Sequence, residues 1–167
     1  MAAPPRSDNE RILILVGAIV LISQDAERCL KLALPFVKSD DPSLGAALKR
    51  AKKLEKRTLG ELTGKFVDAS TSDSPGFAQD MAYLVATRNQ IVHHFKETYG
   101  AQIESGAHQD VIDSLETALA NLNNYRSVLD QLVLAVLEGL CDVTFRGKSE
   151  CSQIAELCAS IRARIES

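Results

Sequence analysis

Apolar residues recur every three or four positions along almost the whole chain, which is the period of an amphipathic α-helix. No stretch alternates apolar and polar positions for long enough to indicate a β-strand, and no internal repeat is present. The pattern therefore predicts an all-α fold: a four- or five-helix, mainly up-and-down bundle whose short loops make neighbouring helices antiparallel. The predicted helices run from about Asn9 to Val37, Ser43 to Phe66, Pro75 to Tyr99, Ala107 to Asp142 and from Ser149 onward.

Capping residues, prolines and glycines divide these helices. A side-chain oxygen that accepts from free amides, followed by proline in the first turn, marks a helix start. Such starts are expected at Asp41–Pro42 and Ser74–Pro75, and Ser149 is expected to cap the last helix without a proline. Gly60 and Gly64 weaken the second helix, which implies a bend or two shorter helices, and Gly100 predicts the end of the third. Bundle-like packing of the fourth is indicated by a seven-residue repeat of Leu115, Leu122, Leu129 and Val136.

The first residues and the apolar run after them set the domain organisation. Residues 1–8 predict a disordered tail and residues 9–167 a single helical domain, since about 100–200 residues is the usual size of one domain. The run Ile12–Ile22 is too short to cross a membrane, which takes about 20 residues, and the acidic Asp8 and Glu10 do not suit a secretory signal. We therefore expect a buried core helix in a cytoplasmic protein with no membrane partner.

Net charge and cysteine usage exclude some classes of function. The chain has 22 acidic and 19 basic residues, a formal net charge of −3. This balance argues against coating nucleic acid by bulk charge but leaves room for a local basic patch. The cysteines form no Cys-x-x-Cys pair, so we expect reduced thiols rather than a zinc site. They are Cys29, Cys141, Cys151 and Cys158.

Familiar catalytic patterns are missing from the sequence. It has no glycine-rich phosphate loop, no Gly-x-Ser-x-Gly and no His-Glu-x-x-His. His93 and His94 are adjacent, so a helix points them about 100° apart and they cannot share a metal ion in that geometry. The sequence therefore predicts neither a metal site nor a cofactor.

Arg88 is an anomaly in the third predicted helix. It falls on the apolar stripe between Leu84 and Val92, each four residues away. A guanidinium is seldom buried unless it is paired, because removing its charge from water costs several kcal/mol. Arg88 must then face a carboxylate, a subunit interface or an anionic ligand, or else extend its charged head to solvent.

Polar residues that can carry chemistry lie beside Arg88. Asn89 and His93 are one helical turn apart on one face, and Lys96 continues that face. Histidine exchanges protons near neutral pH, arginine can clamp phosphate through its rigid fork, and Asn89 can orient either group. The alternative is that His93 and His94 are two solvated histidines on a helix flank.

The segment Thr87–Phe95 resembles the signature of the HEPN superfamily, which is an arginine, a polar residue, a few apolar positions and then a histidine late in a helix. Arg88, Asn89 and His93 match this Arg-Asn-x-x-x-His motif, and Thr58–Leu62 is similar to a segment of many members. The resemblance implies a homodimer whose motif helices form one composite cleft. Active members are metal-independent endoribonucleases, often toxins of toxin–antitoxin or phage-defence systems. Other members serve as dimerising or nucleotide-binding modules.

The roles of the motif residues in RNA cleavage follow from this resemblance. RNA carries its own nucleophile, the ribose 2′-hydroxyl. His93 can accept its proton or deliver one to the leaving 5′-oxygen, and Arg88 can stabilise the charge on the phosphorane. Five residues along a straight helix place the two about 140° apart. The long arginine side chain, a local helix distortion or the partner subunit must therefore bring them together.

A basic run favours an anionic partner. Residues 49–57 hold six positive residues and one negative residue. Such positive charges give a protein affinity for nucleic acid that does not depend on the base sequence. Tyr83 and Tyr99 flank the motif and can stack a base, although ordinary packing explains them equally well. The alternative for the basic run is a solvated helix face, since no aromatic residues are interleaved in it. The expected substrate-binding residues are His94, Lys96, Lys52, Lys53 and Arg57.

The sequence thus predicts a metal-independent HEPN-type endoribonuclease, a toxin or defence factor, that acts as a homodimer on RNA and is controlled by a separate antitoxin or regulatory chain. Its expected catalytic residues are Arg88, Asn89 and His93. An alternative is a non-catalytic HEPN-like module for dimerisation, interaction or regulation. A third interpretation is a helical adaptor in which Arg88 only pairs with a buried acid.

Overall fold

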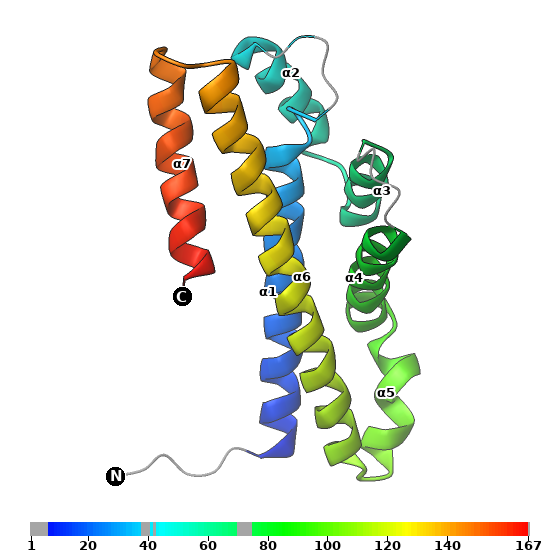
Figure 1. Ribbon diagram of the computed structural model, residues 1–167. Coiled ribbons are helices and arrows are strands. Elements are labelled where there is room, and N and C mark those ends of the chain that lie inside the picture. Colours follow the sequence, from blue (N-terminus) through cyan, green and yellow to red (C-terminus); the bar gives the residue numbers. More distant parts are fainter. Residues whose placement is uncertain (1–6, 38–40, 42, 70–74, 167) are drawn as a thin grey trace, which may run out of the picture.

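The computed structural model describes residues 7–37, 41, 43–69 and 75–166. These residues form seven α-helices and no β-strand, so the prediction of an all-α fold is confirmed (Figure 1). The helices are α1 (Asp8–Ala33), α2 (Leu44–Leu54), α3 (Leu59–Ala69), α4 (Pro75–His93), α5 (Phe95–Glu104), α6 (His108–Val143) and α7 (Ser149–Ile165).

The described residues form more helices than the four or five predicted because two predicted helices are divided. The one expected over Ser43–Phe66 is interrupted at residues 55–58, so the second form of that prediction, two shorter helices, is confirmed. The one expected over Pro75–Tyr99 breaks at His94 and continues as α5 to Glu104. The predicted stop at Gly100 was therefore wrong. The chain turns instead at Gly106, whose φ of 82° is a conformation that glycine adopts without strain.

Two helix starts differ from the predicted ones. The Ser7 hydroxyl accepts from the Glu10 amide at 3.3 Å, and the Ser7 amide donates to the Glu10 carboxylate at 2.9 Å, which is a reciprocal cap on α1. Helix α2 is capped by Ser43 and not by Asp41. Hydrogen bonds from Ser43 to Asp41 instead lower the pKa of the Asp41 carboxyl.

The other predicted ends have mixed outcomes. Helix α1 ends at Ala33, short of the predicted Val37. Helix α7 begins at Ser149, but the predicted cap was wrong, because Lys148 holds the N-cap position and no side chain caps the helix. The predictions made for residues 1–6, Pro42 and Ser74 lie outside the described residues.

Helices α1 and α6 form the long centre of the molecule and run side by side in the same direction (Figure 1). Near their starts Arg11 pairs with Glu116 at 3.1 Å, and further along both helices the Cys29 thiol donates to Asp130 at 3.0 Å. The expected antiparallel arrangement does not hold for this pair, because α2 and α3 are too short to return along the bundle. The fully buried side chains of α1 and α6 include Ile19, Leu30, Ile112, Leu115, Leu122 and Leu129.

The remaining helices cover two sides of this centre (Figure 1). Helices α4 and α5 run antiparallel to α6, since Tyr83 meets Asn121 at 3.2 Å whereas Tyr99 meets Ser114 at 3.2 Å. Helix α3 packs against α4 and α1, and α7 packs antiparallel to α6 on the other side. The start of α3 is close to α4, because a side chain added at Gly60 would contact Val85. This packing places α4 where residues of α1 and α3 surround it.

Buried charge and a disulfide hold α7 in place. Asp130 on α6 is 1% exposed and accepts from Arg164 of α7 at 2.7 Å. Burial, and then the Asp130 carboxylate, raise the pKa of the Cys29 thiol to about 12. Cys141 and Cys151 form a disulfide across the turn between α6 and α7. The prediction of four reduced thiols was therefore wrong, because the helical hairpin brings together two cysteines whose spacing carries no known motif.

No helix in the described part of the chain is long and apolar enough to span a lipid bilayer. The apolar run of α1 instead supplies core residues, among them Ile12 and Ile19.

Candidate functional site

Arg88, Asn89 and His93 come together at the end of α4. One terminal nitrogen of Arg88, Nη1, donates to Asn89 Oδ1 at 3.0 Å and lies 2.8 Å from His93 Nε2. The predicted angular separation is bridged within one chain by the long arginine side chain. Helix α4 ends at His93, and His94, with φ −126° and ψ 24°, leaves the helical conformation. The structure therefore brings all three motif residues into one hydrogen-bonded group.

The Arg88 contact fixes the proton arrangement of His93. A guanidinium has only donors, so His93 Nε2 must be the acceptor in this contact. Because His93 is exposed, this ring is accessible to a ligand in solvent.

Arg88 is half-buried and lies within 4 Å of no carboxylate among the described residues. Two of its stripe neighbours, Leu84 and Ile91, are in the core, whereas Val92 is 41% exposed. The helix therefore turns Arg88 toward the edge of the core. The interpretation in which Arg88 only pairs with a buried acid is not supported by these contacts.

A small pocket of about 120 Å³ adjoins Arg88. The lining acid, Glu27, is already paired with Lys31 at 2.7 Å, so it is partly neutralised. The pocket joins three helices that are far apart in sequence, and its lining from α1 could not be inferred from the Arg88 segment. Its wall consists of Val20, Ser23, Gln24, Glu27, Leu59, Arg88 and Val92. Of these, Leu59, Arg88 and Val92 belong to segments that the sequence singled out, whereas the four residues of α1 do not.

The two other residues expected near the motif are less closely tied to it. His94 is exposed, and its ring centroid lies 6.4 Å from that of His93. Lys96 is exposed in the first turn of α5, a separate helix, so it does not continue the face of Asn89 and His93 as expected. The break at His94 is the reason.

The basic run is divided between exposed and committed side chains. Lys52 and Lys53 are exposed in the last turn of α2. Arg57 donates to Glu61 at 2.7 Å, and Arg50 donates to the backbone carbonyl of Pro35 at 2.7 Å. Part of the predicted phosphate-binding charge is therefore engaged within the chain.

One turn of α1 connects the end of the basic run to the Arg88 pocket. Lys31 donates to the backbone carbonyl of Glu55 at 2.9 Å and pairs with Glu27, which lines that pocket. The end of the basic run, at Glu55, and the Arg88 pocket thus border the same part of α1.

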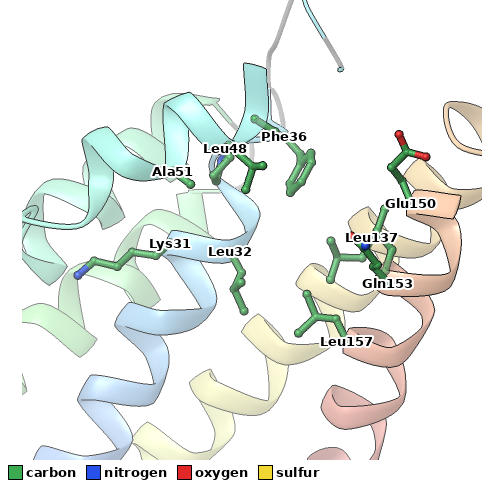
Figure 2. Close-up of a pocket in the computed structure, with 12 residues that line it drawn as sticks. Lys31, Leu32, Phe36, Leu48, Ala51, Leu137, Glu150, Gln153 and Leu157 are labelled. Carbon is green, nitrogen blue, oxygen red and sulfur yellow. The ribbon is translucent and has the colours of Figure 1, made fainter. Parts of the chain in front are cut away.

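A second, more apolar pocket of about 210 Å³ lies away from the motif, between the end of α1, α2, α6 and α7. Figure 2 shows Leu32, Phe36, Leu48, Leu137 and Leu157 around it, whereas the charged head of Lys31 points away. None of the residues predicted to be catalytic or to bind substrate lines this pocket.

Metal ligands and related proteins give no further assignment. In the described residues no group of three or more His, Cys, Asp or Glu side chains is placed to hold a metal ion. No protein-family model matches the chain, and searches of curated proteins and of solved structures found no similar protein. The candidate site therefore depends on the motif residues and on their geometry.

Proposed function

We propose that the chain is a metal-independent endoribonuclease of HEPN type, acting as a toxin or defence factor on RNA. The observation that carries this proposal is the 2.8 Å contact between Arg88 and His93 at the exposed end of α4. An arginine that contacts no carboxylate in the described part of the chain, beside an imidazole nitrogen, is the pair that cleavage through the 2′-hydroxyl needs.

A bound phosphodiester would rearrange this pair. Arg88 prefers an anionic phosphate oxygen to a neutral nitrogen, because charge-assisted hydrogen bonds are roughly twice as strong as neutral ones. Moving the guanidinium to the phosphate frees His93 Nε2 to accept the proton of the 2′-hydroxyl. Asn89 remains within reach to hold the guanidinium in place.

The chemical step then balances without a cofactor. The 2′-oxygen forms a bond to phosphorus as His93 takes its proton, and Arg88 stabilises the charge on the phosphorane. The bond from phosphorus to the 5′-oxygen breaks, and this oxygen receives a proton from a second acid. The products are a 2′,3′-cyclic phosphate and a free 5′-hydroxyl.

A homodimer supplies the second acid in this proposal. Each chain offers one Arg88–His93 pair, whereas the reaction uses both a base and an acid. An exposed apolar row on α1 favours self-association, since Leu13 is 70% exposed and Leu21 is 63% exposed. Val20 of the same helix lines the Arg88 pocket, so the helix that carries this row also borders the site.

The test is cleavage of mixed RNA by the purified protein in EDTA. The intact chain is expected to release fragments that end in 2′,3′-cyclic phosphate. Arg88→Ala and His93→Ala are each expected to lower the rate at least about 100-fold, the usual scale for loss of general acid–base catalysis. Matched controls are Arg28→Ala and His108→Ala, which change the same residue types elsewhere.

The controls are chosen because they lie outside the motif. The Arg28 side chain is 80% exposed, and His108, at the start of α6, lies 3.2 Å from the Ile103 carbonyl and 4.0 Å from Asp8. Both variants are expected to keep full activity. Cleavage that survives both motif substitutions would remove the motif residues from the mechanism, and no cleavage by the intact chain would reject the ribonuclease.

A second candidate function is a non-catalytic HEPN-like module that dimerises and binds a regulatory chain. The observation that favours it is the same exposed row on α1, which needs a partner whether or not RNA is cut. This module differs from the ribonuclease in that the purified protein would form a stable dimer and leave RNA intact. A separate antitoxin chain fits either function.

A further inference from the structure

A polar cleft of about 400 Å³ lies between α4, α5 and α6, on the other flank of α4 from the Arg88 pocket. This volume is in the range of small-molecule sites. Its wall contains five hydroxyl groups, one amide and one carboxylate, with no lysine or arginine. The residues that matter here are Tyr83, Thr87, Gln90, Tyr99 and Asp113.

Thr87 offers an uncommitted hydroxyl to this cleft. It is 6% exposed, and its hydroxyl makes no hydrogen bond within the described residues. Other helical threonines here behave differently: Thr63, Thr98 and Thr117 each donate to the carbonyl four residues earlier, at 2.8–2.9 Å. The Thr87 oxygen is not closed off from solvent, so it opens to the cleft and is available to a bound group.

An aromatic ring is held in place at the same cleft. Asn121 donates to the Tyr83 hydroxyl at 3.2 Å, and the Tyr125 ring lies edge-on at 5.6 Å between centroids. Tyr83 is 37% exposed, so its ring remains available for stacking. The Tyr99 hydroxyl is used by Ser114 at 3.2 Å.

The remaining polar groups define what can bind beside that ring. Asp113 Oδ1 accepts from Gln109 at 2.6 Å, and no basic side chain among the described residues lies within 4 Å of this carboxylate. It therefore accepts donors and repels phosphate. The Gln90 side chain makes no hydrogen bond within the described residues and offers both a donor and an acceptor.

We propose that this cleft binds a nucleobase that carries an exocyclic amino group. The base stacks on Tyr83, its amino group donates to Asp113, and Gln90 and Thr87 contact its polar edge. Glutamine and carboxylate side chains read such amino groups in nucleic acids, and base stacking on aromatic rings is common in single-strand recognition.

The cleft joins the candidate catalytic site at the end of α4, and this part of the proposal rests on the proposed ribonuclease function. The backbone amide of His94 donates to the Gln90 carbonyl at 3.1 Å, so His94 lies one turn beyond Gln90. The rings of His93 and His94 are 6.4 Å apart. A strand with its base in the cleft thus directs its phosphate toward the two histidines, and the cleft selects the base next to the cut.

The test uses free nucleosides, which lack phosphate and so do not depend on Arg88. The chain has three tyrosines and no tryptophan, and all three tyrosines line the cleft or contact Tyr83. Tyrosine ring NMR signals therefore report binding directly. Adenosine is expected to shift the Tyr83 signal and to bind at least about five-fold more tightly than purine riboside, which lacks only the amino group.

Two variants with matched controls sharpen this experiment. Asp113→Asn is expected to abolish the preference for adenosine over purine riboside. Thr87→Val is expected to lower the affinity for adenosine about three- to ten-fold. It is not expected to lower the free energy of unfolding, because the Thr87 hydroxyl has no hydrogen bond to lose within the described residues. Thr63→Val changes an equally buried threonine in α3 and is expected to leave adenosine binding unchanged.

The outcomes separate this proposal from the ribonuclease. Equal binding of both nucleosides, no shift of any tyrosine signal, or tighter binding of spermidine than of adenosine would each overturn the base site, even if RNA is cleaved. Adenosine binding that needs Asp113 would support it, even if RNA is not cleaved.

Discussion

Arg88 interrupts the apolar stripe of α4, and the consequence is energetic as well as chemical. Its place on the stripe could be predicted from the helical period, since it follows Leu84 by four residues. The partner that Arg88 contacts could not be predicted, because the sequence was equally consistent with an acid, a subunit interface or a ligand. The 2.8 Å contact to His93 depends on a side-chain conformation and on the end of α4.

Replacing Arg88 with methionine is expected to raise the free energy of unfolding by about 0.5–1 kcal/mol. A partly buried charge without a counter-ion loses hydration, and an apolar side chain of similar length continues the stripe. Urea unfolding followed by circular dichroism measures the change. A loss of more than about 1 kcal/mol would show instead that Arg88 holds the fold together.

Residues outside the motif show what one segment of sequence leaves hidden. Glu27 and Val20 line the Arg88 pocket from α1, and Thr87 and Asp113 line the polar cleft from α4 and α6. Nothing in their local sequence marks them, because their roles come from helix packing between distant segments. Thr87 lies inside the Thr87–Phe95 segment, but only its missing hydrogen bond distinguishes it from the other helical threonines.

At the level of elements, long periodic helices were predicted to within a few residues and their breaks were not. Helices α1, α6 and α7 lie close to the predicted ranges. The break at His94 has no proline or glycine to signal it. The seven-residue repeat also fails late in α6, where Leu137 is buried in place of Val136. A straight helix drifts about 20° per heptad, so after three heptads the next residue faces the core.

The attachment of α7 depends on Asp130. Asp130→Ala is expected to lower the free energy of unfolding by about 2–3 kcal/mol, because it leaves Arg126 and Arg164 without their shared carboxylate. The cost is below that of a fully buried pair, since the Arg164 side chain is 34% exposed. Thermal or urea unfolding of the oxidised protein measures it.

The matched control for Asp130 is a surface pair. Glu116→Ala removes the partner of Arg11, and both of those side chains are at least 40% exposed. We expect a change within about 0.5 kcal/mol. Equal effects of the two substitutions would show that the buried network does not secure α7.

At the scale of the whole molecule, the sequence pattern could not predict the relative direction of the helices or the association of two chains. Short loops suggested alternating helices, yet α1 and α6 are parallel because the predicted second helix is divided into α2 and α3. The pairing of Cys141 with Cys151 likewise follows from the α6–α7 hairpin and from no motif. The homodimer stays a prediction.

Leu21 tests that dimer. The intact chain is expected to be a dimer at micromolar concentration by light scattering, and Leu21→Lys is expected to yield monomers that also lose RNA cleavage, because the second acid is then missing. Val143→Lys is the control, since Val143 is 85% exposed at the far end of α6. A monomeric intact chain, or equal effects of the two substitutions, contradicts the composite cleft.

The parallel course of α1 and α6 gives the molecule an electrical polarity along its length. Each helix carries about half a positive charge at its start and half a negative charge at its end, so two like poles lie together at either end of the pair. Asp8, Glu10 and Asp110 occupy the first turns and offset the positive pole, whereas the last turn of α6 holds no basic residue. The negative pole of α1 is offset instead by Lys31 in its own last turn and by Arg50 of α2, which donates to the Pro35 carbonyl just beyond it at 2.7 Å. Part of the basic run therefore complements a helix dipole rather than an anion that approaches from solvent.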